Sequence, residues 1–139
     1  MSNLKYFVQF LIILVLFFIF KIIGLKFSSF LSGFIFKFIG PLFRSNKISY
    51  SNLSRALPEL SNVAKKNILK NMWNNYGKIL AEYIFLKDFR LSKKFSGNLI
   101  IENQEELEKI KKDSKPVIFI SGHFNNFELM AMHIEKSGI

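Results

Sequence analysis

Residues 117–131, VIFISGHFNNFELMA, place three local patterns next to one another. An unbroken apolar run ends at Gly122 and His123, two asparagines follow, and a helix-like apolar pattern opens with Glu128. A short apolar run without polar alternation is typical of a strand buried on both faces of a sheet. The stretch therefore predicts a buried strand, a tight loop and a helix, with a histidine at the strand end and a glutamate in the first helical turn.

The flanking sequence extends this alternation in both directions. The predicted elements are a strand, a charged helix, a buried strand and a second helix, at residues 98–103, 103–113, 116–121 and 126–138. Asn126 is the expected N-cap of the last helix, and Gly138 its expected stop. This order predicts an α/β fold, the first βαβα part of a mixed sheet. Ligands of such sheets collect at the carboxyl ends of the strands, where His123 lies.

The N-terminal segment reads as a membrane helix. FVQFLIILVLFFIF, residues 7–20, contains one polar residue, and residues 4–23 as a helix would span about 30 Å, the thickness of a bilayer core. A cleaved signal peptide and an interfacial helix are the alternatives, although no convincing small-residue cleavage site follows. Most of the nearby basic residues come after the helix, which predicts that its C-terminal side is cytoplasmic. They are Lys26, Lys37, Arg44, Lys47 and Arg55.

The next segments predict a second apolar helix, a linker and a long amphipathic helix. Residues 26–40 combine a narrow polar stripe with a broad phenylalanine-rich face, which suits either the headgroup zone of a membrane or packing on a folded domain. Gly40 and Pro41 should end this helix. Residues 44–54 read as a polar linker, and Ser61 is the expected N-cap of the long helix that follows.

Composition supports a partly membrane-bound, basic protein. Eleven of the 17 Phe fall within the first 43 residues, and all ten acidic residues lie at Glu59 or later. The net charge of +10 predicts attraction to anionic partners, and the apolar N-terminus favours a membrane over nucleic acid, for which no fingerprint is present. The chain has no cysteine, which excludes disulfides, thiolate metal sites and a cysteine nucleophile.

His123 and Glu128 could form a proton-handling pair. The Glu128 carboxylate would accept a hydrogen bond from one imidazole nitrogen and leave the other nitrogen basic, able to take a proton from an attacking hydroxyl. Gly122 and the turn at Asn125 and Asn126 could direct backbone N–H groups at a developing oxyanion. The competing interpretation is an ordinary loop histidine beside a helix whose first turn carries a favourable acid.

A metal site is not predicted. His133 completes a spacing of i, i+5, i+10 with His123 and Glu128, and that spacing matches no ligand motif of zinc helices. We expect His133 to be a helix-surface histidine or a hydrogen-bonded core histidine, and we expect no cofactor.

Three segments resemble the lipid A biosynthesis acyltransferases, which add lauroyl or myristoyl chains. FISGHFNNFE is similar to that family's strand and H-x4-E turn, and NLSRALPELS and MWNNYGKILAEY are similar to its upstream pattern. The resemblance implies acyl transfer from acyl carrier protein to a hydroxyl of an anionic lipid A precursor, at the cytoplasmic face of the bacterial inner membrane. By motif match, His123 would be the general base and Glu128 its orienting partner. Asn125 stands where the family commonly has glycine, and Phe127 where it usually has tryptophan.

The residues and the resemblance together give the expected domain boundaries, and two rival functions remain. We assign residues 1–25 to a transmembrane helix, 26–55 to an interfacial helix and linker, and 56–139 to the N-terminal part of a cytoplasmic acyltransferase domain. Because family members are about twice as long, we expect the sheet to be incomplete within these 139 residues. The rival functions are acyl transfer to another membrane lipid (a glycerophospholipid, ornithine lipid or glycolipid) and a non-catalytic, membrane-anchored basic module.

Overall fold

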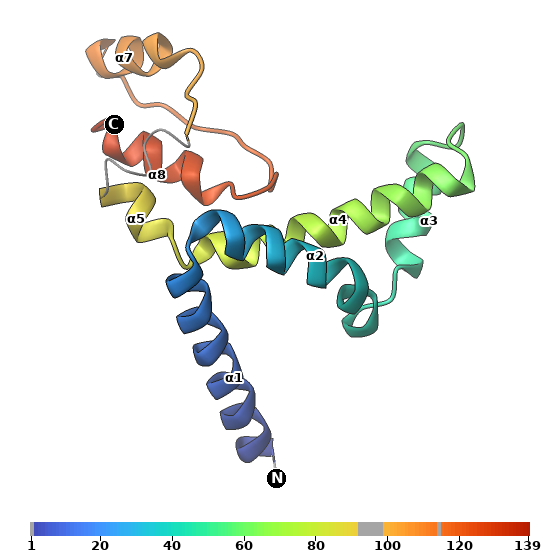
Figure 1. Cartoon of the computed structure of the whole chain (residues 1–139). Helices are drawn as coiled ribbons and strands as arrows, with labels where there is room; N and C mark the ends of the chain where they lie inside the picture. The colour runs from blue at the N-terminus through green and yellow to red at the C-terminus, as the bar shows by residue number, and fades with distance from the viewer. Residues whose placement is uncertain (1, 92–98, 114) are drawn as a thin grey trace. The chain divides into compact units, whose positions relative to one another are not determined.

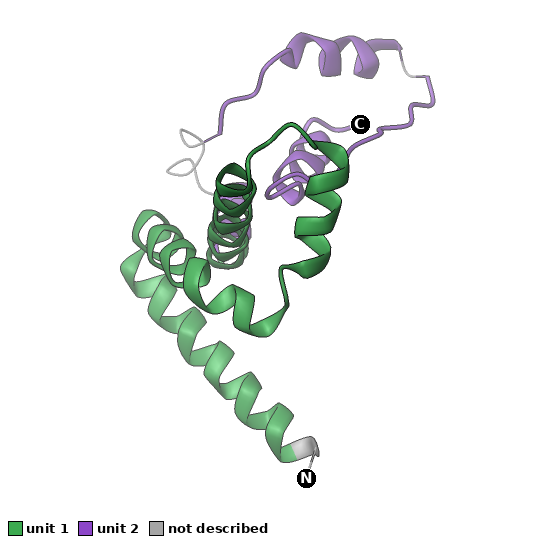
Figure 2. Cartoon of the chain, turned by 90° about the vertical axis from the view of Figure 1, so that its right-hand side faces the viewer, with its two compact units in different colours: residues 1–84 green, residues 85–139 purple. Residues whose placement is uncertain are grey.

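The computed structural model describes residues 2–91, 99–113 and 115–139, and all its regular elements there are helices (Figure 1). The helices are α1 (Ser2–Ile23), α2 (Leu25–Phe43), α3 (Lys47–Ala56), α4 (Asn62–Tyr83), α5 (Leu86–Leu91), α7 (Gln104–Asp113) and α8 (Glu128–Lys136). They divide into two compact units, Met1–Ile84 and Phe85–Ile139 (Figure 2). We refer to these as unit 1 and unit 2. The domain boundaries expected from the sequence stay a prediction.

The α/β prediction is wrong, because the described residues contain neither a strand nor a sheet. Of the first predicted strand, Asn98 lies outside the described residues and Leu99–Asn103 is irregular. The second, residues 116–121, is irregular as well, and Ile118 and Ile120 are 87% and 93% exposed. A strand requires a neighbour to pair its backbone groups, and the described chain supplies none at either segment.

The apolar N-terminal helices agree with the sequence. Leu4–Ile23 and Leu25–Phe43 are each long and apolar enough to cross a membrane. Only 6% of the apolar stretch of the first helix is buried. Gly24 separates the two helices with φ +81° and ψ 167°, a conformation that only glycine adopts readily. A Cβ at Gly24 would meet no atom within 4 Å, so the backbone conformation alone requires glycine there.

Unit 1 is built on the packing of α2 against α4, which run side by side in Figure 1. Small residues allow the close approach: Ser28 and Ser32 of α2 and Ala81 of α4 are at most 2% exposed. A Cβ added at Gly77 of α4 would lie 2.4 Å from the Ser32 carbonyl oxygen. Four of the phenylalanine side chains of α2 are exposed instead: Phe27, Phe30, Phe34 and Phe38 are 51–72% exposed.

The N-cap predicted for α4 is confirmed, since the Ser61 hydroxyl accepts a hydrogen bond from the Ala64 N–H at 3.2 Å. Two other expectations are wrong. The helix α2 continues through Pro41 to Phe43, and the expected linker is largely the helix α3. The α3 region is tied down by polar contacts that local sequence does not show. Trp73 Nε1 donates to Asn46 Oδ1 at 2.6 Å, and the Tyr50 hydroxyl lies 2.8 Å from Asn62 Oδ1.

Replacing Gly77 by alanine should destabilise unit 1. In a helix interior alanine is about 1 kcal/mol more favourable than glycine, so the substitution by itself would stabilise α4. Only crowding against another part of the structure can make its net effect destabilising. Because the added methyl group would meet the Ser32 backbone, which cannot rotate away, we expect a net loss of about 1–3 kcal/mol. Thermal unfolding in nonionic detergent, followed by circular dichroism, measures it.

The matched control is Asn71→Ala on the exposed face of α4, which should leave stability unchanged or slightly raised. A Gly77→Ala protein as stable as this control would show that α2 and α4 do not depend on the close approach.

Candidate active site

The motif residues occupy a loop and the start of a helix in unit 2. The loop turns tightly, with the Phe124 N–H donating to the Gly122 carbonyl at 2.9 Å. Asn125 follows in the left-handed region, with φ 48°. Asparagine tolerates this conformation better than other non-glycine residues, which explains how Asn125 can stand at a position where the family commonly has glycine.

The helix α8 begins at Glu128, one residue later than an N-cap at Asn126 would give. Its N-terminal cap is Phe127, without a side-chain cap hydrogen bond, so the prediction of Asn126 as N-cap is wrong. Asn126 is instead buried, 8% exposed, and its backbone carbonyl accepts the Leu129 N–H at 3.1 Å. At the other end, Gly138 has φ 78° and its N–H bonds to the Glu135 carbonyl, which confirms it as the stop.

His123 and Glu128 flank the same turn, but no hydrogen bond or ion pair joins them among the described contacts. The exposed His123 ring lies edge-on to the Phe127 ring, with 4.3 Å between centroids. Glu128 is partly exposed at the first position of α8, where the helix dipole favours its negative charge. Catalytic hydrogen bonds are often long before substrate binds, so this geometry leaves the pair as a prediction. The contact with Phe127 was missed by the sequence analysis.

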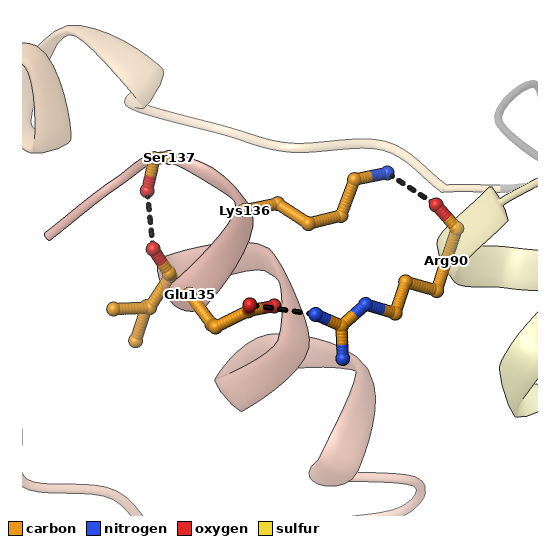
Figure 3. A network of polar contacts seen from close by, with 5 residues as sticks. Arg90, Glu135, Lys136 and Ser137 are labelled. Atoms are coloured by element: carbon orange, nitrogen blue, oxygen red, sulfur yellow. Dashed lines mark hydrogen bonds and ion pairs between the residues drawn. The ribbon is translucent and has the colours of Figure 1, made fainter.

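Polar contacts at its C-terminal end hold α8 to the rest of unit 2 (Figure 3). Arg90 Nη2 of α5 pairs with Glu135 Oε1 at 2.6 Å, and Lys136 Nζ donates to the Arg90 carbonyl at 2.9 Å. Lys111 Nζ of α7 donates to the Ser137 carbonyl at 2.9 Å. The Arg90–Glu135 pair is about half exposed on each side, so it orients α8 more than it stabilises the unit.

An apolar cavity of about 660 Å³ adjoins the motif within unit 2. Gly122 and Asn126 are among its lining residues, whereas His123 and Glu128 are not. Most of the wall comes from the segments that were expected to form strands, from α7 and from α8. These apolar lining residues include Leu99, Ile101, Leu107, Phe119, Met130 and Ile134. Segments predicted to be neighbours in a sheet thus line one cavity without forming a ladder.

His133 also lines this cavity, which the sequence analysis did not foresee. Its Nε2 is buried and has no hydrogen-bond partner within the described part of the chain. The helical spacing of Leu129, Met130, His133 and Ile134 is the signal that could have placed it on the cavity side. Across residues 2–91, 99–113 and 115–139, no group of three or more potential metal ligands occurs.

Substitutions at Asn125 should show how far the stability of the turn depends on its left-handed backbone conformation. Asn125→Gly should keep stability within about 0.5 kcal/mol, because glycine adopts positive φ freely. Asn125→Val should lose about 1–3 kcal/mol, because a β-branched residue is strained there. Thermal unfolding of the two variants tests this. Equal stability of the valine and glycine variants would contradict the left-handed turn.

Comparison with known proteins gives one family and no individual relative. The sequence profile of the bacterial lipid A biosynthesis acyltransferases matches residues 1–138, essentially the whole chain. No curated protein and no solved structure matches the chain significantly. Together with the two apolar N-terminal helices, the family indicates association with a membrane. The resemblance noted in the sequence is thereby confirmed: the chain belongs to the family of bacterial lipid A biosynthesis acyltransferases.

Proposed function

We propose that the protein transfers a fatty acyl chain from acyl carrier protein to a hydroxyl of a lipid A precursor. The observation that carries this proposal is the family match over residues 1–138, which includes the H-x4-E motif from His123 to Glu128. The acyl donor, the acceptor and the roles of the two residues are inferences from that match and from the local chemistry. The proposed site faces the cytoplasm, because the basic residues follow α1 rather than precede it.

The reaction requires a base at the acceptor hydroxyl. In the proposed mechanism an imidazole nitrogen of His123 removes the hydroxyl proton while the oxygen attacks the thioester carbonyl of the donor. The tetrahedral intermediate then collapses, breaking the carbon–sulfur bond, and the imidazolium returns its proton to the leaving thiolate. The Glu128 carboxylate would hold the imidazole in the correct tautomer and stabilise the imidazolium. No covalent acyl-enzyme forms.

The exposure of His123 suits this role, since an acceptor on a large lipid has to reach it. Backbone N–H groups near Gly122, Asn125 and Asn126 are the proposed donors to the oxyanion. The Phe124 N–H is already used by the Gly122 carbonyl, so it is the poorest of the candidates in that turn.

The apolar cavity beside the turn supports the choice of an acyl substrate. Its volume of about 660 Å³ lies within the range of small-molecule sites, and its wall is mainly aliphatic and aromatic. Gly122 belongs to both the cavity wall and the motif, so a chain held in the cavity would end close to the proposed oxyanion donors. A donor acyl chain in this cavity would place its thioester at the motif.

The test is acyl transfer from acyl carrier protein to a lipid A precursor by the purified protein. His123→Ala should lower turnover by about a hundredfold or more, because the hydroxyl then has no positioned base. Glu128→Ala should cost less than removing His123, since it acts through the imidazole. Membrane association, measured by vesicle flotation, should be unchanged in both variants.

Glu135→Gln is the matched control, because it removes an exposed carboxylate from the same helix and should retain near-wild-type turnover. Turnover of His123→Ala close to that of the wild type would refute the general-base role. Preference for a glycerophospholipid, ornithine lipid or glycolipid acceptor in the same assay would keep the chemistry and overturn the proposed acceptor.

The proposed orientation has its own test. A reporter fused after Arg55 should be active in its cytoplasmic form and silent in its periplasmic form, because the residues after α1 carry most of the nearby positive charge. A fusion at residue 2 serves as the control for the opposite end of α1. A periplasmic signal from the Arg55 fusion would reverse the orientation.

A further inference from the structure

Positive charge is concentrated in unit 1. Residues 1–84 contain eleven Lys and Arg against two Glu and no Asp, which gives +9 of the chain's net +10. Unit 2, which contains the H-x4-E motif, is almost balanced by comparison. Attraction to anionic groups is therefore a property of the helical unit that carries α1 and α2.

The packing of α2 favours a position of this charge at a bilayer surface. Its small-residue face is covered by α4, while its phenylalanine face is exposed. The helix α4 carries three exposed lysines, Lys66, Lys70 and Lys78; Lys70 Nζ lies 5.6 Å from the Phe38 ring centre of α2. Such a helix is expelled from a hydrocarbon core, so a partner packed along it lies in the interface rather than across the membrane.

Unit 1 contains a cavity of about 740 Å³ between the end of α2, α3 and α4, which we call the α3 pocket. All its lining residues belong to unit 1. Its apolar wall includes Phe36, Phe43, Ile48, Met72, Tyr76 and Leu80. The side chains of Phe43 and Ile48 are 81% and 65% exposed, so apolar surface continues from the pocket to the outside of the unit.

One wall of the α3 pocket is held in a fixed position. Trp73 lines the pocket, and its Nε1 bonds to Asn46 Oδ1 at 2.6 Å. The Trp73 ring lies directly over Gly40 of α2, where an added Cβ would lie only 2.3 Å from a ring atom. The indole is thus fixed by one hydrogen bond and by close contact with the α2 backbone.

The lining of the α3 pocket also includes one cationic side chain and several polar side chains. Arg44 follows the last residue of α2, is exposed, and makes no side-chain hydrogen bond or ion pair with any other described residue. Ser45, Ser49 and Asn52 line the pocket as well. A guanidinium with its donors unused, beside hydroxyl and amide groups, is suited to a phosphate.

We propose that the α3 pocket binds an anionic phospholipid of the surrounding bilayer, with an acyl chain against Trp73 and Tyr76 and the phosphate at Arg44. The apolar wall matches the chain, the unpaired guanidinium matches the headgroup, and the interfacial position of α2 brings the pocket to the lipid. This site goes beyond the proposed acyl transfer, because neither His123 nor Glu128 belongs to its lining.

Trp73 makes the proposal directly measurable, because it is the single tryptophan of the chain. Bromine atoms on a lipid acyl chain quench an indole only on contact. The full chain in nonionic detergent micelles is titrated with phosphatidylglycerol or phosphatidylcholine, each brominated on one acyl chain, and Trp73 fluorescence is recorded. Phosphatidylglycerol should quench with a saturable curve whose midpoint lies at an about fivefold lower lipid fraction than that of phosphatidylcholine.

Two variants and one control assign the effect to the pocket. Arg44→Gln should remove the preference for phosphatidylglycerol, whereas Lys66→Gln, which changes an exposed cation of α4 outside the pocket lining, should keep it. Ser49→Phe should fill the pocket and lower maximal quenching by both lipids, with vesicle flotation unchanged. If Ser49→Phe loses its helical circular dichroism, the comparison of Arg44→Gln with Lys66→Gln decides.

Equal midpoints for the two lipids, or a preference that survives Arg44→Gln, would overturn the proposal and leave Trp73 in general contact with the micelle. Because the readout is fluorescence and not acyl transfer, failure of the catalytic proposal would leave this result unaffected.

Discussion

Unit 1 depends on how closely the backbone of α4 approaches the backbone of α2. Gly77 lies against the Ser32 carbonyl, and the Trp73 ring lies against Gly40, so at both points a single methyl group would force the helices apart. Large side chains also add to this contact, where Phe36 lies against Gly77. Small residues in contact leave the phenylalanines free for a membrane and leave space at the end of α2 for a pocket lined by α3 and α4. The close packing of the two helices thus follows from residue size.

The helices were largely predictable, because their signals are local. The apolar periods of α1, α2 and α4, the cap at Ser61 and the stop at Gly138 are each set by a few neighbouring residues, and the structure contains them. The helix α3 was missed because its order depends on bonds from Trp73 and Tyr50. The strands were mispredicted for a related reason: apolar runs such as residues 117–120 report which side chains favour burial, not whether another segment will pair with them.

In the candidate site, too, the features set by neighbouring residues were predictable, and those set by packing between segments were not. The left-handed turn at Asn125 follows from the kind of residue found there, and the loop-to-helix corner follows from the pattern around it. The position of His133 in the cavity wall depends on how α8 sits in unit 2. That placement rests on Arg90, Glu135 and Lys111, which the sequence presents only as ordinary surface charges.

Gly24 has a consequence for how the protein meets bilayers of different thickness. It separates α1 from α2 with a backbone conformation closed to other residues, and no side chain approaches the position where its Cβ would be. If α1 spans a bilayer, a longer or shorter hydrocarbon thickness would be met by a change in the tilt of α1 at this residue, and Phe20, which is 2% exposed, would have to repack. The buried Phe20 side chain and the hydrogen bond from the Ser28 hydroxyl to the Gly24 carbonyl, at 2.8 Å, link α1 to α2 across this glycine, so hydrophobic mismatch at α1 would act first on these contacts.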